Sequence, residues 1–120
     1  MDDPGPYLEL LGTDVTVVID RPLGSAHPDY PDLVYRSNYG YVPGTLAGDG
    51  EAIDAYVLGP EGPVKEFRGR CIAVIQRRDD NEHKLVVAAE TLEKHQIERE
   101  TWFVEQYYDS IVLLPGDVNT

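Results

Sequence analysis

A short acidic stretch of the chain, residues 48–56, carries three carboxylates close together: Asp49, Glu51 and Asp54. The Asp-Gly pair that opens it favours a turn, because glycine accepts a positive φ angle without a Cβ clash. The apolar segment 53–58 that follows is typical of a strand, in which alternate side chains point to opposite faces. We therefore expect the turn to place Asp49 and Glu51 over the start of the strand, close to Asp54.

Three carboxylates that lie so close repel one another unless a cation lies between them. A hard divalent cation such as Mg²⁺ relieves this repulsion, since it takes one or two carboxylates together with water and substrate phosphate. Acidic residues in a Gly-rich turn are more often simply solvated, and the stretch alone favours that interpretation. Asp54 is harder to explain in this way, because it lies inside an apolar strand and Asp is depleted in strands.

A second acidic stretch, Asp79-Asp80-Asn81-Glu82, lies just before Lys84. Carboxylates on two neighbouring loops of a barrel can bracket more than one metal ion, while Lys84 and Arg21 supply positive charge for a phosphate. Each basic residue alone is more often a solvated surface charge. The co-occurrence of both acidic stretches with both cations is what favours a phosphate site. A Gly-rich phosphate-binding loop and zinc-ligand spacing of the histidines are both absent from the sequence.

Charge and composition narrow the class of protein. The 120 residues include 22 acidic and 10 basic side chains, and the net charge of −12 disfavours partners such as nucleic acid and anionic membranes. A small phosphate ligand is compatible with this charge when metal ions neutralise the site. No run approaches the roughly 20 apolar residues of a membrane helix. The acidic N-terminus does not resemble a secretory signal, and the single cysteine, Cys71, suggests a reducing compartment, so we expect a cytoplasmic protein.

The elements that must position these residues are short strands followed by one helix. Runs of β-branched residues predict strands over 14–20, 53–58, 69–77 and 84–88, with a short strand or a turn at 7–11 and shorter strand candidates at 33–36 and 111–114. Apolar residues three and four positions apart predict a helix over 95–108. The proline-rich segment 22–32 is typical of a surface loop. We therefore expect one mainly β (α+β) domain over 1–120, a small antiparallel barrel with the C-terminal helix packed across it.

Several of these segments resemble the soluble, Mg²⁺-dependent inorganic pyrophosphatases that fold as a barrel. The similarity covers about residues 14–108 and keeps the order of the motifs. Its most specific part joins Asn38-Tyr39-Gly40-Tyr41 and Thr45-Leu46 to Asp49-Gly50-Glu51-Ala52-Ile53-Asp54, where the family has Asp-x-Asp-Pro-aliphatic-Asp. Weaker similarities involve Asp20-Arg21, the second acidic stretch with Lys84, and Phe103-Val104-Glu105-Gln106-Tyr107, which resembles the aromatic start of the family's C-terminal helix.

The resemblance implies a five-stranded β-barrel like that of oligonucleotide-binding (OB) proteins, a Mg²⁺ cofactor, and hydrolysis of inorganic pyrophosphate by metal-activated water. The implied metal ligands are Asp49, Asp54, Asp79 and Glu82, with Asp80 an alternative to Asp79. Glu51 stands where the family has the Asp that helps to activate the attacking water, so the expected catalytic residues are Glu51 and Asp54. The implied phosphate-binding residues are Arg21, Tyr39, Lys84 and Tyr107. A homo-oligomer also agrees with the resemblance.

Some positions depart from the family pattern. Glu stands in place of Asp at Glu51 and Glu82, which adds a methylene group where position decides the rate. An early Lys and Glu of the family site have no counterpart between Asp20 and Tyr39, and Tyr108 stands where the family has a phosphate-binding Lys. The loss of cations leaves an alternative open: a non-catalytic or altered-specificity relative that binds a phosphorylated metabolite, a nucleotide or a protein partner.

Overall fold

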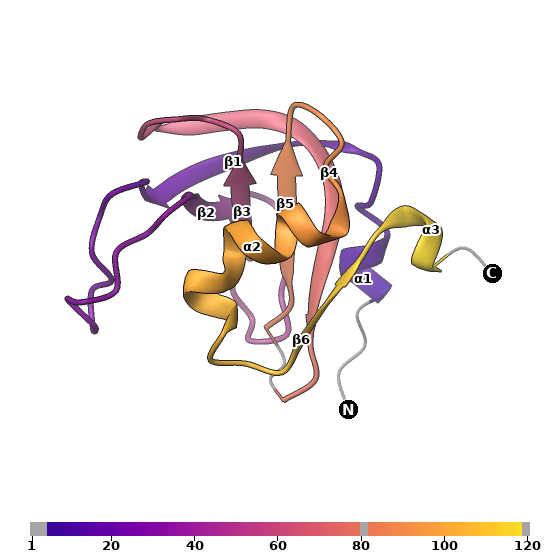
Figure 1. The fold of residues 1–120 in the computed structure, drawn as a ribbon. Coiled ribbons are helices and arrows are strands. Elements are labelled where there is room, and N and C mark those ends of the chain that lie inside the picture. The colour runs from indigo at the N-terminus through magenta and orange to yellow at the C-terminus, as the bar shows by residue number, and fades with distance from the viewer. Residues whose placement is uncertain (1–4, 80–81, 119–120) are drawn as a thin grey trace.

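The computed structural model describes residues 5–79 and 82–118, and within them one sheet curls round on itself with a helix across its outer face (Figure 1). The strands of this sheet are β1 (Asp14–Arg21), β2 (Asn38–Val42), β3 (Ile53–Leu58), β4 (Glu66–Arg77), β5 (Lys84–Ala88) and β6 (Ser110–Leu113). The helices are α1 (Gly5–Leu8), α2 (Lys94–Glu105) and α3 (Pro115–Val118). None of the helices in the described residues is long and apolar enough to cross a membrane.

Five strands form a closed barrel in the order β1-β2-β3-β5-β4, which the pairing of β1 with β4 completes. Strand β6 pairs with the far half of β4. The predicted five-stranded barrel with a C-terminal helix is therefore confirmed. One pairing departs from a purely antiparallel barrel, because β3 and β5 run parallel. This arises because β4 comes between them along the chain, while β5 lies between β3 and β4 in the sheet.

The boundaries of most elements agree with the sequence prediction. Strands β3 and β5 match it residue for residue, whereas β4 begins earlier, at Glu66, because its first residues pair with β1. Helix α2 ends at Glu105, so the aromatic segment that follows Thr101 lies at the end of the helix rather than at its start. Of the short strand or turn expected at 7–11, the structure forms the turn, which begins with helix α1, and 33–36 contributes only an isolated bridge between Ala26 and Val34.

The glycine of the Tyr-Gly-Tyr segment brings β1 and β2 into close contact. A Cβ atom on Gly40 would lie 1.8 Å from the carbonyl oxygen of Val18, so a larger residue there would force the two strands apart. The register of β1 also shifts between Ile19 and Arg21, and a bulge of this kind re-aims the side chains that follow it. As a result Arg21 lies directly opposite Tyr39.

Alternation along the strands builds two apolar layers. In β3, the side chains of Ile53, Ala55 and Val57 belong to the cluster that fills the barrel. Tyr56 and Leu58 point the other way and pack in a second cluster beneath helix α2 (Figure 1). The predicted division of β3 into two faces is confirmed, and it places Asp54 on the same face as Tyr56, outside the barrel core.

Candidate active site

Asp54 and Lys84 meet at the start of two parallel strands. Ala55 of β3 lies opposite Leu85 of β5, so the residues that precede them are neighbours. The ammonium nitrogen of Lys84 lies 3.0 Å from Oδ2 of Asp54 and 3.8 Å from Oε1 of Glu82. The Lys84 side chain is only 5% exposed. A buried cation therefore lies between one carboxylate from each of the two acidic stretches.

Tyr39 of β2 contacts Asp54, and Arg21 of β1 packs beside Tyr39. The hydroxyl of Tyr39 donates a hydrogen bond of 2.8 Å to Oδ2 of Asp54. Burial raises the pKa of Tyr39 well above its usual value, and the Asp54 carboxylate raises it further, so this hydroxyl stays a donor. The guanidinium carbon of Arg21 lies 5.8 Å from the ring centre of Tyr39, and Arg21 donates a hydrogen bond of 2.7 Å to the Tyr35 hydroxyl.

An open cavity of about 820 Å³ lies over these groups. Most of the predicted site residues line it: Arg21, Tyr39, Asp54, Glu82, Lys84 and Tyr107. The remaining walls come from the loop between β1 and β2, which extends away from the barrel in Figure 1, and from the end of α2. The structure thus gathers two predicted carboxylate ligands and the predicted phosphate-binding residues around one cavity.

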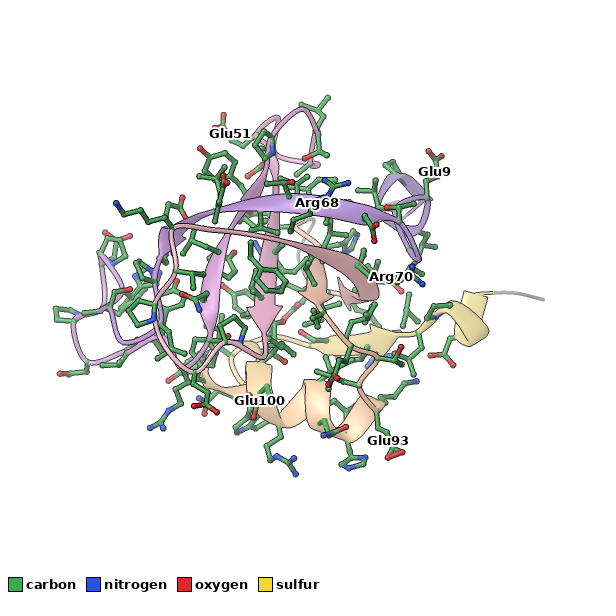
Figure 2. All side chains as sticks on the ribbon, turned by 90° about the horizontal axis from the view of Figure 1, so that it is seen from above. Glu9, Glu51, Arg68, Arg70, Glu93 and Glu100 are labelled. Carbon is green, nitrogen blue, oxygen red and sulfur yellow. The ribbon has the colours of Figure 1, made fainter. Side chains whose placement is uncertain are left out.

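The other predicted site residues have different surroundings and lie outside this cavity lining, as far as residues 5–79 and 82–118 form it. Oδ1 of Asp49 accepts a hydrogen bond of 3.0 Å from the backbone N–H of Glu51, within a turn in which Gly50 has a φ angle of 86°. Glu51 points away from the barrel at the edge of the molecule (Figure 2). Oδ2 of Asp79 accepts a hydrogen bond of 3.1 Å from the backbone N–H of Asp109. Asp80, the alternative to Asp79, lies outside the described residues.

The first acidic turn nevertheless lies at the same end of the barrel as the cavity. The Tyr7 hydroxyl accepts a hydrogen bond of 3.2 Å from the backbone N–H of Gly48. Burial raises the pKa of Tyr7, and the carboxylates of Asp49, Glu82 and Asp54 raise it further, against the opposing effect of the hydrogen bond from Gly48. The Tyr7 ring also packs edge-on against His83, with ring centres 5.0 Å apart, so Tyr7 contacts both the first acidic turn and the segment just before β5.

The carboxylate oxygens at the cavity are donors that suit a hard cation, and the protein supplies only a few of them. Within residues 5–79 and 82–118, no three His, Cys, Asp or Glu side chains are grouped closely enough to hold a metal ion. Mg²⁺ in phosphate-processing sites is commonly held by one or two carboxylates, and water and substrate phosphate complete its shell. Asp54 and Glu82 are two carboxylates at the cavity, and the Lys84 ammonium group lies between them.

Sequence reasoning missed a buried polar network behind the cavity. Glu105 accepts two hydrogen bonds from the Arg77 guanidinium group, one of 3.1 Å from Nε and one of 2.7 Å from Nη2. It also accepts a hydrogen bond of 2.6 Å from the Tyr56 hydroxyl and one of 2.5 Å from the Ser110 hydroxyl. Burial acts to raise the pKa of the Glu105 carboxyl, but the hydrogen bonds and charge of Arg77 outweigh it and the pKa is lowered. The network ties the end of α2 to β3, β4 and β6. The sequence feature that points to this network is the four-residue spacing of Ile97, Thr101 and Glu105, because it places a glutamate on the buried face of the helix.

Tyr108, at which the sequence departs from the family pattern, packs against a cation, and the sequence did not reveal this contact. Its ring covers Arg77, whose guanidinium carbon lies 3.7 Å from the ring centre. Both side chains line the cavity beside Tyr107. Tyr108 therefore supplies an aromatic wall of the cavity, and the positive charge beneath it comes from Arg77 of β4.

Comparisons with known proteins add to this geometry. The family model described as inorganic pyrophosphatase matches residues 15–111. The inorganic pyrophosphatase of Gluconobacter oxydans is 33% identical over 75 residues, which are 58% of this chain and 43% of that protein. The inorganic pyrophosphatase of Helicobacter pylori is 30% identical over 120 residues, covering 81% of this chain and 68% of that protein. The crystal structure of inorganic pyrophosphatase from Ehrlichia chaffeensis shares the fold, with a TM-score of 0.66 at 17% identity over 88% of each chain. The match to Gluconobacter oxydans thus spans less than half of that relative's length.

Proposed function

The chain belongs to the inorganic pyrophosphatase family, and on that premise we propose that it hydrolyses inorganic pyrophosphate to phosphate with the help of Mg²⁺. The observation that carries the proposal is the meeting of Asp54, Glu82 and Lys84 at one cavity, although Asp54 and Lys84 are 30 positions apart in the chain. The family is metal-dependent, and carboxylate ligands beside a phosphate site favour Mg²⁺ among the divalent cations.

Asp54 and Glu82 are the ligands that the geometry supports best, and we extend the set to Asp49 and Asp79. Asp49 and Asp79 lie outside the cavity lining and each accepts a hydrogen bond from a backbone N–H group, so both side chains must rotate toward the cavity to complete the set. When bound, Mg²⁺ supplies charge neutralisation at the phosphate oxygens and makes a coordinated water more acidic.

The remaining residues bind the substrate and move a proton. Lys84 and Arg21 place positive charge at the cavity, where it attracts the phosphate oxygens and stabilises the charge of the departing phosphate. Tyr39 holds the Asp54 carboxylate by its hydrogen bond, and Tyr107 offers a further hydroxyl at the cavity wall. Glu51 accepts the proton of the attacking water as general base, a role for which its turn must bring it over the start of β3.

Phosphate release from pyrophosphate tests this function directly. We expect release in Mg²⁺, loss of release in EDTA, and a decrease of at least a hundredfold in Asp54→Asn. The matched control is Asp14→Asn, which removes the same charge from an exposed side chain at the start of β1. Release that is absent in Mg²⁺, or equal in the wild type and Asp54→Asn, would reject the proposal.

A second candidate is a relative that binds a phosphorylated ligand without hydrolysing it. It is favoured by the shortage of cations at the cavity, since two carboxylates already flank Lys84 and the Tyr108 ring covers Arg77. This candidate predicts that Mg²⁺ with pyrophosphate raises the melting temperature while no phosphate is released. Release of phosphate that depends on Asp54 excludes it.

We also propose a cytoplasmic location and a homo-oligomer for this protein. Aromatic residues are enriched at protein–protein interfaces, and Trp102 on α2 is 61% exposed. Light scattering of the purified chain tests the assembly, and fractionation of cells that express it tests the location. A monomer at high concentration, or recovery with membranes, contradicts the respective proposal.

A further inference from the structure

The cavity is much larger than pyrophosphate requires. Its volume of about 820 Å³ falls within the range of about 300–1,000 Å³ that is typical of sites for drug-sized ligands. Pyrophosphate, with two phosphorus and seven oxygen atoms, occupies only the end at which Asp54, Lys84 and Arg21 lie. The other end is formed by the loop between β1 and β2 and by the residues after α2.

Exposed aromatic side chains line that other end. Tyr30 of the loop is 66% exposed and Tyr107, which follows α2, is 69% exposed, yet both line the cavity. Tyr108 lies beside Tyr107 and is 39% exposed. Exposed rings on two separate walls, such as those of Tyr30 and Tyr107, are suited to hold a flat ring, because every nucleobase has a π-face that stacks on an aromatic side chain.

The rings of the loop form a continuous row that leads to the reaction centre. The ring centres of Tyr30 and His27 are 5.0 Å apart, those of His27 and Tyr35 are 6.1 Å apart and nearly parallel, and those of Tyr35 and Tyr39 are 5.5 Å apart. Tyr39 in turn donates its hydrogen bond to Asp54. The aromatic end and the phosphate end therefore belong to one cavity, joined by packed side chains.

The loop that carries these rings is an ordered hairpin. His27 donates a backbone hydrogen bond of 2.8 Å to Leu33, and Tyr35 donates one of 2.8 Å to Ser25. The His27 ring is fixed as well, since its Nδ1 accepts a hydrogen bond of 3.0 Å from the backbone N–H of Asp29. These contacts hold the aromatic wall in place before any ligand arrives, which lowers the entropic cost of binding.

Two carboxylates at the aromatic end of the cavity determine which ligands can bind there. Asp29 and Asp32 line this end, so their carboxylates repel further phosphate groups and accept hydrogen bonds from amino groups. An inorganic polyphosphate is disfavoured by these charges. A neutral base with an exocyclic amino group, such as adenine, suits both the rings and the carboxylates.

From these observations we infer that the cavity accepts a nucleoside diphosphate and releases its terminal phosphate. The inference rests on the proposed function, because the same groups carry out the hydrolysis. The base stacks against the exposed ring of Tyr30, while the diphosphate reaches Lys84 and Arg21. A water oxygen bonds to the terminal phosphorus, and the bond from that phosphorus to the bridging oxygen breaks. The electron pair leaves with the nucleoside monophosphate, and the proton of the water passes to Glu51 once its turn has brought it over the start of β3.

Three substrates in Mg²⁺ test the inference: pyrophosphate, ADP and methyl diphosphate, an ester of the same kind that lacks a base. For the wild type we expect kcat/KM to be at least tenfold higher for ADP than for methyl diphosphate. Tyr30→Ala should remove most of that preference and change the values for pyrophosphate and methyl diphosphate by less than twofold. Val34→Ala is the matched control in the same loop, because Val34 is exposed and is not among the residues that line the cavity.

The outcomes separate the two proposals. Release from pyrophosphate without release from ADP overturns the inference alone, and release from none of the three substrates overturns the proposed function as well. Equal kcat/KM for ADP and methyl diphosphate also overturns the inference, since the base then contributes nothing. A Tyr30→Ala variant that loses activity toward all three substrates to the same extent assigns Tyr30 a structural role and overturns the stacking contact.

Discussion

The ammonium nitrogen of Lys84 lies 3.0 Å from Oδ2 of Asp54, across the parallel pair of strands β3 and β5. Lys84 is 5% exposed and Asp54 is 33% exposed, so water screens this pair less than it screens an ion pair on the surface. Loss of one member leaves the charge of the other uncompensated in a partly desolvated place. The stability of the site therefore depends on this ion pair, and a substitution of Lys84 tests the dependence.

Replacement of Lys84 by Met should weaken substrate binding. A charge-assisted hydrogen bond to phosphate contributes about 1.5–3 kcal/mol, so we expect kcat/KM for pyrophosphate to fall about 10- to 100-fold, mainly through a higher KM. Steady-state kinetics at constant free Mg²⁺ measure this. The matched control is Lys65→Met, which removes the same charge from an exposed side chain before β4. Unchanged KM in Lys84→Met contradicts a role of Lys84 in phosphate binding.

A single methyl group at Gly40 should destabilise the barrel. A Cβ atom there meets the Val18 carbonyl oxygen at 1.8 Å, a backbone collision that no side-chain rotation relieves. We expect Gly40→Ala to lower the free energy of unfolding by about 3 kcal/mol, as for an overpacked core position. Urea denaturation measures the change. Gly62→Ala, which places its Cβ atom in open space, should change stability by less than about 1 kcal/mol.

Runs of β-branched residues were sufficient to predict most strands, because such residues fit the pleated surface of a sheet. Strands β3 and β5 were predicted to the residue for this reason. Their parallel pairing was not, since a run of apolar residues does not identify the strand that lies beside it. The early start of β4 at Glu66 was missed likewise, because its polar first half is held by pairing with β1 rather than by burial.

For the candidate site, too, the sequence predicted the direction of some side chains and not of others. Asp54 was expected to face the site because strand alternation fixes the side of the sheet to which it points. Lys84 was expected there because it follows the second acidic stretch. The directions of Asp49 and Asp79 depend on single hydrogen bonds to backbone N–H groups, which no spacing rule reveals. The Arg77–Glu105 pair went unnoticed because its members are 28 positions apart and each looks like an ordinary surface charge in the sequence.

Breaking the buried ion pair should cost far more than breaking the exposed pair next to it. Arg77 and Glu105 are 4% and 6% exposed, whereas Arg78 and Asp109 are each 56% exposed, and both pairs have a closest N–O distance of 2.7 Å. We expect Glu105→Gln to lower the free energy of unfolding by about 3 kcal/mol and Asp109→Asn to lower it by less than about 1 kcal/mol. Urea denaturation at pH 7 compares them. Equal losses would show that burial does not strengthen the inner pair.

The same carboxylate should make stability depend on pH in the acidic range. Burial acts to raise the pKa of Glu105, but Arg77 overcomes that effect, so the pKa in the folded state lies below the usual 4.5 of the unfolded chain. The unfolded state therefore takes up this proton first as the pH falls. The stabilisation is complete above about pH 4.5 and is lost as the pH falls through the lower, folded-state value. Because the amide side chain introduced by Glu105→Gln does not titrate, the difference in unfolding free energy between the wild type and this variant should shrink from pH 7 to pH 3. A difference that stays constant over this range would mean that the hydrogen bonds of the network, and not the charge of Glu105, hold the end of α2 against the barrel.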